Sequence, residues 1–357
     1  MKNSLARKIV ASTLAFSMVF GCSFVASATD ATTEGETEGE AVAYDASLLE
    51  AGAAEEGDKY GITIASYFPD EGPAQETMEA FKTAIEDATN KRITVDIQAN
   101  GALGNAKEIS EGLHAGTINM GAIAYEDMES YGPEYAVFEA PYLFRDLDHF
   151  WSFFNQYGDQ IFSEYEEQSG IKTAAITYRG ARMITANKEV KEPEDLKGLK
   201  FRLPSMPIRV DVFEAFGASP TIVDFSELYM ALKTGTVDAE ENPPETIYSY
   251  KYYEAQKYMM LSRHIFTVAR YCISDEWFDT LSEDDQKLIL NAWKYAQAQI
   301  EEKYPDPDEE FIEKCKEEGM EIVEPDNAAF QEIAAPVVKE YSEKNWKEGI
   351  YDLINSL

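Results

Sequence analysis

The stretch from Gly61 to Ile97, GITIASYFPDEGPAQETMEAFKTAIEDATNKRITVDI, carries the pattern that decides the fold. It opens with the apolar run Gly61–Ala65, which is typical of a strand. The segment Gln75–Thr89 follows with apolar residues at helical spacing, and Arg92–Ile97 alternates between apolar and polar residues as a second strand does. A strand, a helix and a strand in this order predict a β-α-β unit, the building block of an α/β fold.

The same rhythm continues along the chain. We predict further strands at Met120–Ala124, Lys172–Tyr178, Leu199–Leu203, Thr221–Val223 and Thr236–Ala239, and helices at Ala106–Ala115, Ile208–Phe216, Ser226–Lys233 and Glu283–Glu302. The order favours a mostly parallel sheet with helices on both faces, in two α/β lobes that crossover segments join. Ligands of such sheets bind at the carboxyl ends of the strands.

Residues 1–28 are typical of an export signal. A basic start leads into the apolar stretch Ile9–Val25, and Ala26-Ser27-Ala28 forms a cleavage site. The place of cleavage stays open, because the residues that end at Cys22 resemble a lipoprotein cleavage box that would leave Cys22 lipidated. Residues 29–58 are rich in Thr, Glu, Gly and Ala, which predicts a flexible acidic linker. We expect an exported protein, periplasmic or at the cell surface, either free or lipid-anchored.

The composition limits the classes of partner. The chain has 357 residues, of which 45% are hydrophobic, and this is enough for two domains with real cores. Its formal net charge of -35 repels nucleic acid and anionic lipid headgroups, so we expect neither as a partner. An acidic protein can still bind an anion through a local cluster of positive groups. Individual arginines are therefore the candidate anion-binding residues.

Motifs of catalysis are missing from the sequence. The histidines His114, His149 and His264 do not lie in a metal-binding pattern, and there is no phosphate loop or nucleophile elbow. Cys272 and Cys315 are expected as buried small residues. We therefore predict a protein without cofactor, metal or enzymatic activity. A secreted α/β enzyme acting on a carboxylated carbohydrate remains the alternative, and it would need an acid–base pair or a metal.

One strand carries a candidate anion-binding residue. In Leu199–Pro204 the apolar residues Leu199, Phe201 and Leu203 share one face of the strand, and Arg202 lies on the other. Arg202 stands at the end of the strand, just before the proline turn, so it is aimed at the carboxyl edge of the sheet. From the residues alone, a surface arginine is the alternative interpretation.

An ordered series of segments resembles the solute-binding proteins of tripartite ATP-independent periplasmic (TRAP) transporters. The segments are Leu103-Gly104, Pro141–Phe144, Gly180–Thr185, Pro193–Pro204, Phe216–Thr221, Phe225–Leu232 and Thr234–Pro243. The resemblance implies a two-lobed, type II-like periplasmic-binding-protein fold, with crossovers and a long helix spanning both lobes, for which Glu283–Glu302 is the candidate. We place the first lobe at 59–179 with 268–307, and the second at 180–267 with 308–357.

The resemblance also implies a function and the residues that perform it. The protein would capture a small organic acid, such as a uronate, another sugar acid or a dicarboxylate, and as a monomer deliver it to integral-membrane permease subunits. Arg202 would hold the ligand carboxylate, because a guanidinium fork matches a carboxylate bidentately. Asn242 would donate a further hydrogen bond, Arg182 would be a second basic contact, Phe225 would form an aromatic wall, and Tyr67 would contact the ligand.

The chain departs from the sialic-acid-binding members of that family. Those proteins carry a glutamate and a nearby arginine after the strand that here includes Gly121–Ala124, and this chain has Ala124 and Asp127 at the matching positions. Sialic acid is therefore not the expected ligand. Asp127, together with Tyr125 and Glu126, is a candidate determinant of ligand identity.

Overall fold

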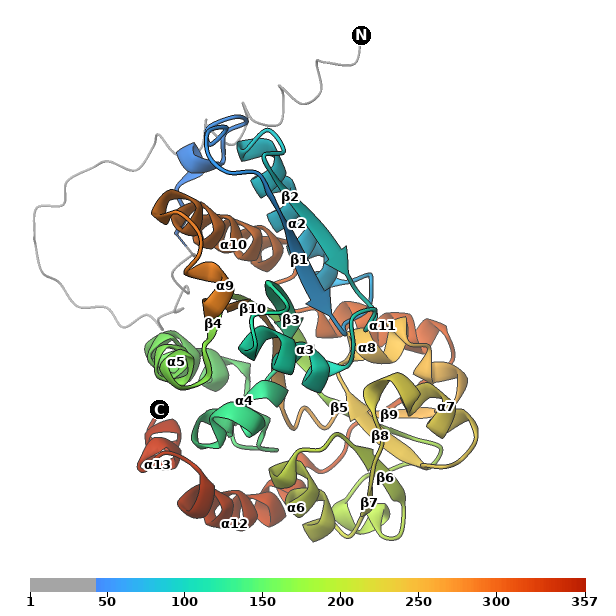
Figure 1. Ribbon diagram of the computed structural model, residues 1–357. Helices are drawn as coiled ribbons and strands as arrows, with labels where there is room; N and C mark the ends of the chain where they lie inside the picture. Colours follow the sequence, from blue (N-terminus) through green and yellow to red (C-terminus); the bar gives the residue numbers. More distant parts are fainter. Residues whose placement is uncertain (1–42) are drawn as a thin grey trace, which may run out of the picture. The chain divides into compact units, whose positions relative to one another are not determined.

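The computed structural model describes residues 43–357. The predicted export signal, Cys22 and the first part of the predicted linker lie outside these residues. Two mixed sheets with helices packed around them make up the described part (Figure 1). Within it, none of the helices combines the length and apolar character that a membrane span requires.

The first sheet has the strand order β2-β1-β3-β10-β4. Its strands are β1 (Tyr60–Ser66), β2 (Ile93–Gln98), β3 (Met120–Ile123), β4 (Ile171–Ala181) and β10 (Phe266–Ser274). Strand β1 pairs in parallel with β2 and β3, as the β-α-β pattern predicts, whereas β10 runs antiparallel to β3 and β4. The sequence did not indicate β10, because it is buried at every position and shows no alternation.

The second sheet has the order β11-β9-β5-β8-β6-β7. Its strands are β5 (Met183–Ala186), β6 (Lys200–Leu203), β7 (Ser219–Ile222), β8 (Ala239–Asn242), β9 (Tyr258–Met260) and β11 (Glu321–Val323). Strand β6 is parallel to β7 and β8, and β5 is antiparallel to β8 and β9. Strand β8 starts where the predicted strand Thr236–Ala239 ends. Both sheets are therefore mixed, in contrast to the mostly parallel sheet predicted.

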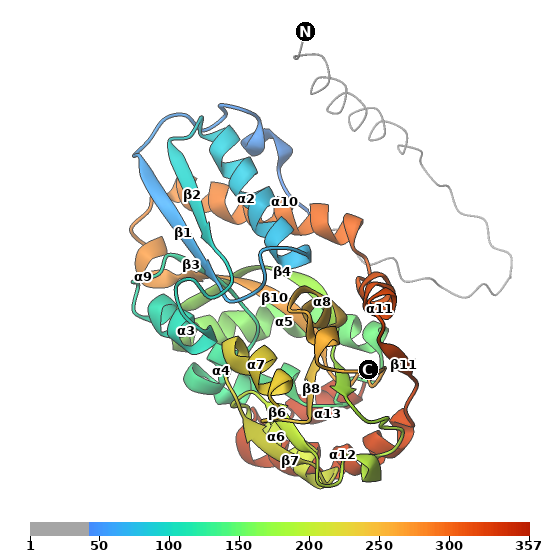
Figure 2. The same cartoon turned by 90° about the vertical axis from the view of Figure 1, so that its right-hand side faces the viewer.

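Helices cover both sheets (Figure 2). Their bounds are α2 (Pro73–Ala88), α3 (Ala106–His114), α4 (Glu126–Tyr131), α5 (Leu147–Ser169), α6 (Pro207–Ala215), α7 (Leu228–Lys233), α8 (Pro244–Ser249), α9 (Asp275–Phe278), α10 (Glu283–Lys303), α11 (Asp308–Glu317), α12 (Asn327–Asn345) and α13 (Ile350–Asn355). Short 3₁₀ segments are η1 (Ala46–Leu49), η2 (Pro133–Glu139), η3 (Pro193–Leu196), η4 (Phe225–Glu227) and η5 (Tyr252–Glu254). Helices α2 and α10 pack together beside the first sheet, where Phe81 stacks on Trp293 with ring centroids 3.9 Å apart.

The chain passes between the sheets at crossover segments. One of them joins β4 to β5, and Gly180 stands near the end of β4 just before it, with a φ of +110° that suits glycine. A Cβ at this position would lie 2.2 Å from Asp308 Oδ1, and both oxygens of Asp308 accept hydrogen bonds from the Ala181 amide at 3.1 and 3.0 Å. Asp308 thus ties the start of α11 to the end of β4.

The predicted helix Glu283–Glu302 is present as α10 (Glu283–Lys303), and the shorter helix α11 follows it. Helix α10 packs against α2 and β4 of the first sheet, and α11 packs mainly against α8 beside the second sheet. Pro305 and Pro307 separate the two helices, because proline cannot continue a helix from its interior. The lobe boundaries derived from the sequence stay a prediction.

The end of the predicted linker contacts the folded domain. The backbone amide of Asp45 donates to Asn291 Oδ1 at 2.7 Å, and Asn291 Nδ2 donates to the Asp45 carbonyl at 2.9 Å. Arg92 donates to the backbone carbonyls of Ala54 at 3.1 Å and Asp58 at 2.8 Å. Composition predicted a flexible linker through residue 58. The partners that hold residues 45–58 are distant in sequence, and local composition does not reveal them.

Candidate ligand-binding site

Residues from both sheets converge at the carboxyl ends of their strands. Arg202 is in β6, Asn242 is the last residue of β8, and Arg182 lies between β4 and β5. Phe225 begins η4 after β7, and Tyr67 follows β1 of the first sheet. The structure thus brings five of the six predicted ligand-binding residues to the strand ends where a ligand of this fold would lie.

Arg202 differs from the other buried arginines of the described part in that it has no carboxylate partner. The buried arginines are Arg92, Arg179, Arg182, Arg202, Arg209 and Arg270. Within residues 43–357, all but Arg202 form an ion pair with a carboxylate. The Arg202 side chain is 2% exposed, and its one hydrogen bond in the described part runs from Nε to the Val223 carbonyl at 2.9 Å. Burial lowers the pKa of Arg202, as expected for a guanidinium without a partner charge.

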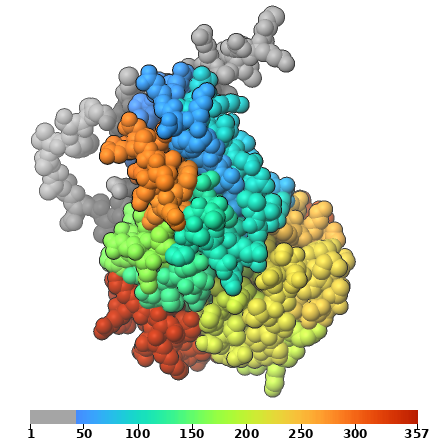
Figure 3. Space-filling model, in the orientation of Figure 1, coloured from blue at the N-terminus to red at the C-terminus, as the bar shows by residue number. Residues whose placement is uncertain are grey.

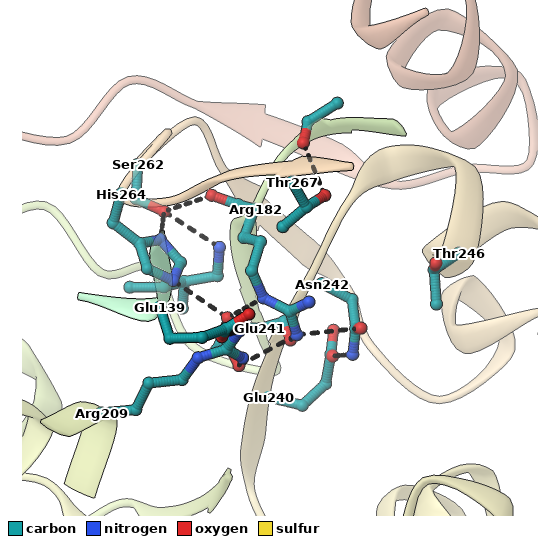
Figure 4. A network of polar contacts seen from close by, with 12 residues as sticks. Glu139, Arg182, Arg209, Glu240, Glu241, Asn242, Thr246, Ser262, His264 and Thr267 are labelled. Atoms are coloured by element: carbon teal, nitrogen blue, oxygen red, sulfur yellow. Dashed lines mark hydrogen bonds and ion pairs between the residues drawn. The ribbon is translucent and has the colours of Figure 1, made fainter. Parts of the chain in front are cut away.

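Arg182 is held by the strand beside it (Figure 4). Its Nε and Nη2 donate to the carboxylate of Glu241, and Nη2 also donates to Asn242 Oδ1 at 3.0 Å. Burial alone would raise the pKa of Glu241, but the charges of Arg182 and Arg209 hold it well below its usual range. The Nε2 atom of His264 lies 3.0 Å from Glu241 Oε2, and burial lowers the pKa of His264.

The ion pairs of Arg209 connect a segment that follows the first sheet with one that follows the second. Arg209 of α6 donates through Nη1 to Glu241 at 3.0 Å, and its Nη2 donates to Glu139 at the end of η2 (Figure 4). Helix α4 and η2 pack together after β3 of the first sheet, whereas α6 follows β6 of the second. Arg182 and Arg209 are therefore both neutralised by neighbouring carboxylates.

Asn242 is oriented by its hydrogen bonds. Its Oδ1 accepts from Arg182, and its Nδ2 donates to Glu240 Oε2 at 2.6 Å. Thr185 donates to the other oxygen of Glu240 at 2.5 Å. Burial raises the pKa of Glu240 to about 7. Because an amide nitrogen carries two N–H groups, Asn242 retains one donor beyond the bond to Glu240.

Aromatic residues meet where the two sheets approach each other. The rings of Tyr67 and Phe225 are 5.8 Å apart, and Phe225 lies 4.9 Å from Tyr250. The hydroxyl of Tyr250 donates to the Tyr67 carbonyl at 3.1 Å, and that of Tyr67 donates to Glu126 Oε1 at 2.9 Å. The surface shows the teal segments of the first sheet directly against the yellow segments of the second (Figure 3).

Asp127 is placed apart from this group. It is fully buried, and its carboxylate accepts from Arg270 Nη1 at 2.7 Å and from the Tyr165 hydroxyl at 2.8 Å. Its neighbour Glu126 instead contacts Tyr67. The side chains of α4 thus diverge, with Asp127 inside the first lobe and Glu126 toward the aromatic contact.

Sequence reasoning missed several polar residues of this region. Glu139, Arg209, Glu240, Glu241, His264 and Tyr252 were not proposed as site residues. The two adjacent glutamates in the middle of β8 could have indicated these residues, because consecutive acids in a buried strand require partners. Throughout residues 43–357, no group of three or more acidic, histidine or cysteine side chains is arranged to hold a metal ion.

Comparisons with known proteins agree with this geometry. The family model described as bacterial extracellular solute-binding protein, family 7, matches residues 64–345. A solute-binding protein of Roseobacter denitrificans is 32% identical over 282 residues, 78% of this chain and 84% of that protein. The 2,3-diketo-L-gulonate-binding periplasmic protein of Escherichia coli is 29% identical over 280 residues, 78% of this chain and 85% of that protein.

A solved structure shows the same fold. The crystal structure of a TRAP periplasmic solute-binding protein from Roseobacter denitrificans, with bound L-galactonate, matches with a TM-score of 0.78 and 28% sequence identity. The match covers 84% of this chain and 99% of that chain. The predicted two-lobed α/β architecture is therefore confirmed.

Proposed function

The chain belongs to family 7 of the bacterial extracellular solute-binding proteins, and on this premise we propose that it captures a small organic acid and delivers it to the membrane permease subunits of a TRAP-type transporter. The organic acid would be a uronate, another sugar acid or a dicarboxylate. Its family and structural neighbours are transport proteins that bind a solute, so the alternative of a secreted enzyme finds no support. The protein would act outside the cytoplasm as a monomer.

The unpaired guanidinium of Arg202 is the observation that supports this proposal. A buried guanidinium without a carboxylate partner is costly, and a ligand carboxylate would supply the missing charge through two parallel hydrogen bonds. The free N–H of Asn242 and the Nη1 of Arg182, which has no hydrogen bond within the described part, would donate to the same ligand. The Tyr67 and Phe225 rings would cover its apolar face.

Capture and release require the two lobes to separate. Arg209–Glu139 and Tyr250–Tyr67 join residues that follow different sheets, and these contacts support a closed arrangement of the lobes. We propose that the ligand enters an open form and stabilises the closed form through contacts to both lobes.

A thermal-shift screen of organic acids, followed by calorimetric titration, tests the function. A ligand at one hundred times its dissociation constant should stabilise the protein by about 2.7 kcal/mol. Arg202→Ala should abolish this stabilisation, whereas Arg145→Ala, which removes an exposed arginine, should preserve it. A neutral sugar that stabilises the protein as well as any acid would contradict the proposal.

The fate of the N-terminus falls on residues outside the described part. Lipidation at Cys22 and cleavage after Ala28 would give exported proteins of different mass and N-terminal chemistry. Intact-mass measurement of the protein isolated from cells distinguishes them.

A further inference from the structure

We propose that the ligand is a hydroxylated monocarboxylate, that Glu126 accepts a hydrogen bond from one of its hydroxyl groups, and that the site rejects dicarboxylates. This inference rests on the proposed function and decides between two ligand classes that the function leaves open. It also assigns a specificity-determining role to Glu126.

The balance of charges allows one ligand carboxylate. Of the three arginines in the site, Arg182 and Arg209 are already paired with Glu241 and Glu139. Only Arg202 lacks a carboxylate partner within the described residues. A second ligand carboxylate would therefore enter a largely buried region without a free cation to receive it.

Glu126, at the start of α4 after β3, offers a hydrogen-bond acceptor. Glu126 Oε1 accepts from the Tyr67 hydroxyl at 2.9 Å, whereas its buried Oε2 has no hydrogen-bond partner in the described part of the chain. A carboxylate oxygen of this kind accepts from a hydroxyl, and it repels another carboxylate. The group that satisfies Glu126 is thus a ligand hydroxyl.

Glu126 and Arg202 belong to the same site, although they follow different sheets. Arg202 donates to the carbonyl of Val223, and Phe225 stands two residues further along the chain. The Phe225 ring contacts the Tyr67 ring at 5.8 Å, and Tyr67 in turn donates to Glu126. A series of contacts through Phe225 and Tyr67 therefore links Arg202 of the second sheet to Glu126, which follows the first.

Tyr252 adds a second group suited to hydroxyls. Its hydroxyl is buried and has no hydrogen-bond partner within residues 43–357. Burial, reinforced by the nearby charge of Glu240, raises the pKa of Tyr252 well above its usual range, so the hydroxyl stays protonated. It can donate to a ligand hydroxyl or accept from one.

Pairs of ligands that differ at a single carbon test the charge argument. D-Galactonate and galactarate share their hydroxyl groups along the chain, and the second replaces a terminal CH₂OH with a carboxylate. D-Gluconate and D-glucarate form an equivalent pair. By calorimetric titration of the wild-type protein, we expect the tightest binder of a panel that also includes D-glucuronate, D-galacturonate and succinate to be a monocarboxylate. It should bind at least about 100-fold more tightly than its dicarboxylate counterpart, because like charges at a desolvated contact are strongly unfavourable.

A substitution of Glu126 tests its role. Glu126→Gln keeps the shape and removes the charge, so it should weaken the preferred monocarboxylate by about tenfold or more. It should also reduce the preference over the dicarboxylate. The matched control Glu111→Gln removes a charge from the exposed face of α3 and should leave both affinities within about twofold, as surface changes far from a ligand usually do.

Different results of these titrations would contradict the inference on the ligand class and the proposed function. A dicarboxylate that binds most tightly, and whose binding Arg202→Ala abolishes, would overturn the inference while supporting the function. A wild-type protein that binds no carboxylate would overturn both. Unchanged monocarboxylate affinity in a folded Glu126→Gln protein, checked by circular dichroism, would overturn the role of Glu126.

Discussion

Geometry, as well as charge, distinguishes Arg202 from a lysine at the same position. A guanidinium presents two parallel donors to a carboxylate, and an ammonium does not. Truncating one partner of a buried charge pair costs about 2–5 kcal/mol, so Arg202→Ala should lose binding by this amount and Arg202→Lys should recover only part of it. Calorimetric titration of both variants measures the difference.

The unliganded fold should survive both changes. The apolar residues Phe201 and Leu203, which flank Arg202 in β6, are buried in the core and are not altered. Circular dichroism and thermal unfolding without ligand provide the control. Wild-type affinity in Arg202→Lys would contradict bidentate binding. Wild-type affinity in Arg202→Ala would show that Arg202 does not bind the ligand carboxylate and would leave Arg182 as the candidate.

Some residues of the candidate site could be predicted from the sequence, whereas their partners could not. The resemblance to a known family located Arg202, Arg182, Asn242, Phe225 and Tyr67, and their roles remain proposals. The hydrogen-bond and ion-pair partners of these residues could not be predicted, because they lie in segments that are distant in the sequence. Arg182 and Glu241 are 59 residues apart, for example. The buried pair between Asp127 and Arg270 joins residues 143 apart, and no local pattern predicts it.

The crossover from β4 to β5 is the element most sensitive to a small substitution. Gly180→Ala would impose a positive φ on alanine and place its Cβ against Asp308, which would have to release the Ala181 amide. We expect a loss of about 3 kcal/mol or more in the free energy of unfolding. Urea unfolding measures it.

Gly170 provides a matched control at the end of α5. It also has a positive φ, +66°, but a Cβ there would meet nothing within 4 Å. Gly170→Ala should therefore cost only the backbone term of about 1 kcal/mol. Equal losses in the two variants would show that the Asp308 contact contributes nothing.

Elements with a clear local period were predictable. The first β-α-β units agree with their predicted positions within a few residues, because apolar spacing determines which face of each helix and strand is buried. The short strands β5, β9 and β11 were not predicted from the sequence. Strand β10 was missed because it is buried throughout.

At the scale of the whole molecule, buried acids should make stability depend on pH. Burial raises the pKa of Glu240 and Asp308 to about 7, and that of Asp275 to about 6. In the unfolded chain these groups ionise near pH 4. The folded state therefore binds more protons between about pH 4 and 7, so their contribution to stability is complete below this window and is lost as the pH rises through it.

The measurable consequence is a lower midpoint of thermal unfolding at pH 7.5 than at pH 5.5, by on the order of a few degrees. His264 acts in the opposite direction, because burial lowers its pKa and the unfolded chain takes up a proton first below about pH 6.5. The three acids outweigh this single group. Asp308→Asn should reduce the difference in scanning calorimetry, and a higher midpoint at pH 7.5 would contradict the assignment.

Closure of the two lobes should depend on the ligand. A bound acid that contacts both lobes should favour the closed form, in which Arg209 pairs with Glu139. Small-angle scattering should show a smaller radius of gyration with saturating ligand than without it. An unchanged radius would indicate a rigid pocket.

The lone guanidinium of Arg202 also gives the empty protein a reason to remain open. Closing without cargo would trap a positive charge away from water with nothing to balance it, whereas a carboxylate removes that cost. Ligand binding and closure of the lobes would then occur together. Arg202→Met, which removes the charge, should consequently shut more readily when empty, and the same scattering measurement without ligand would reveal it.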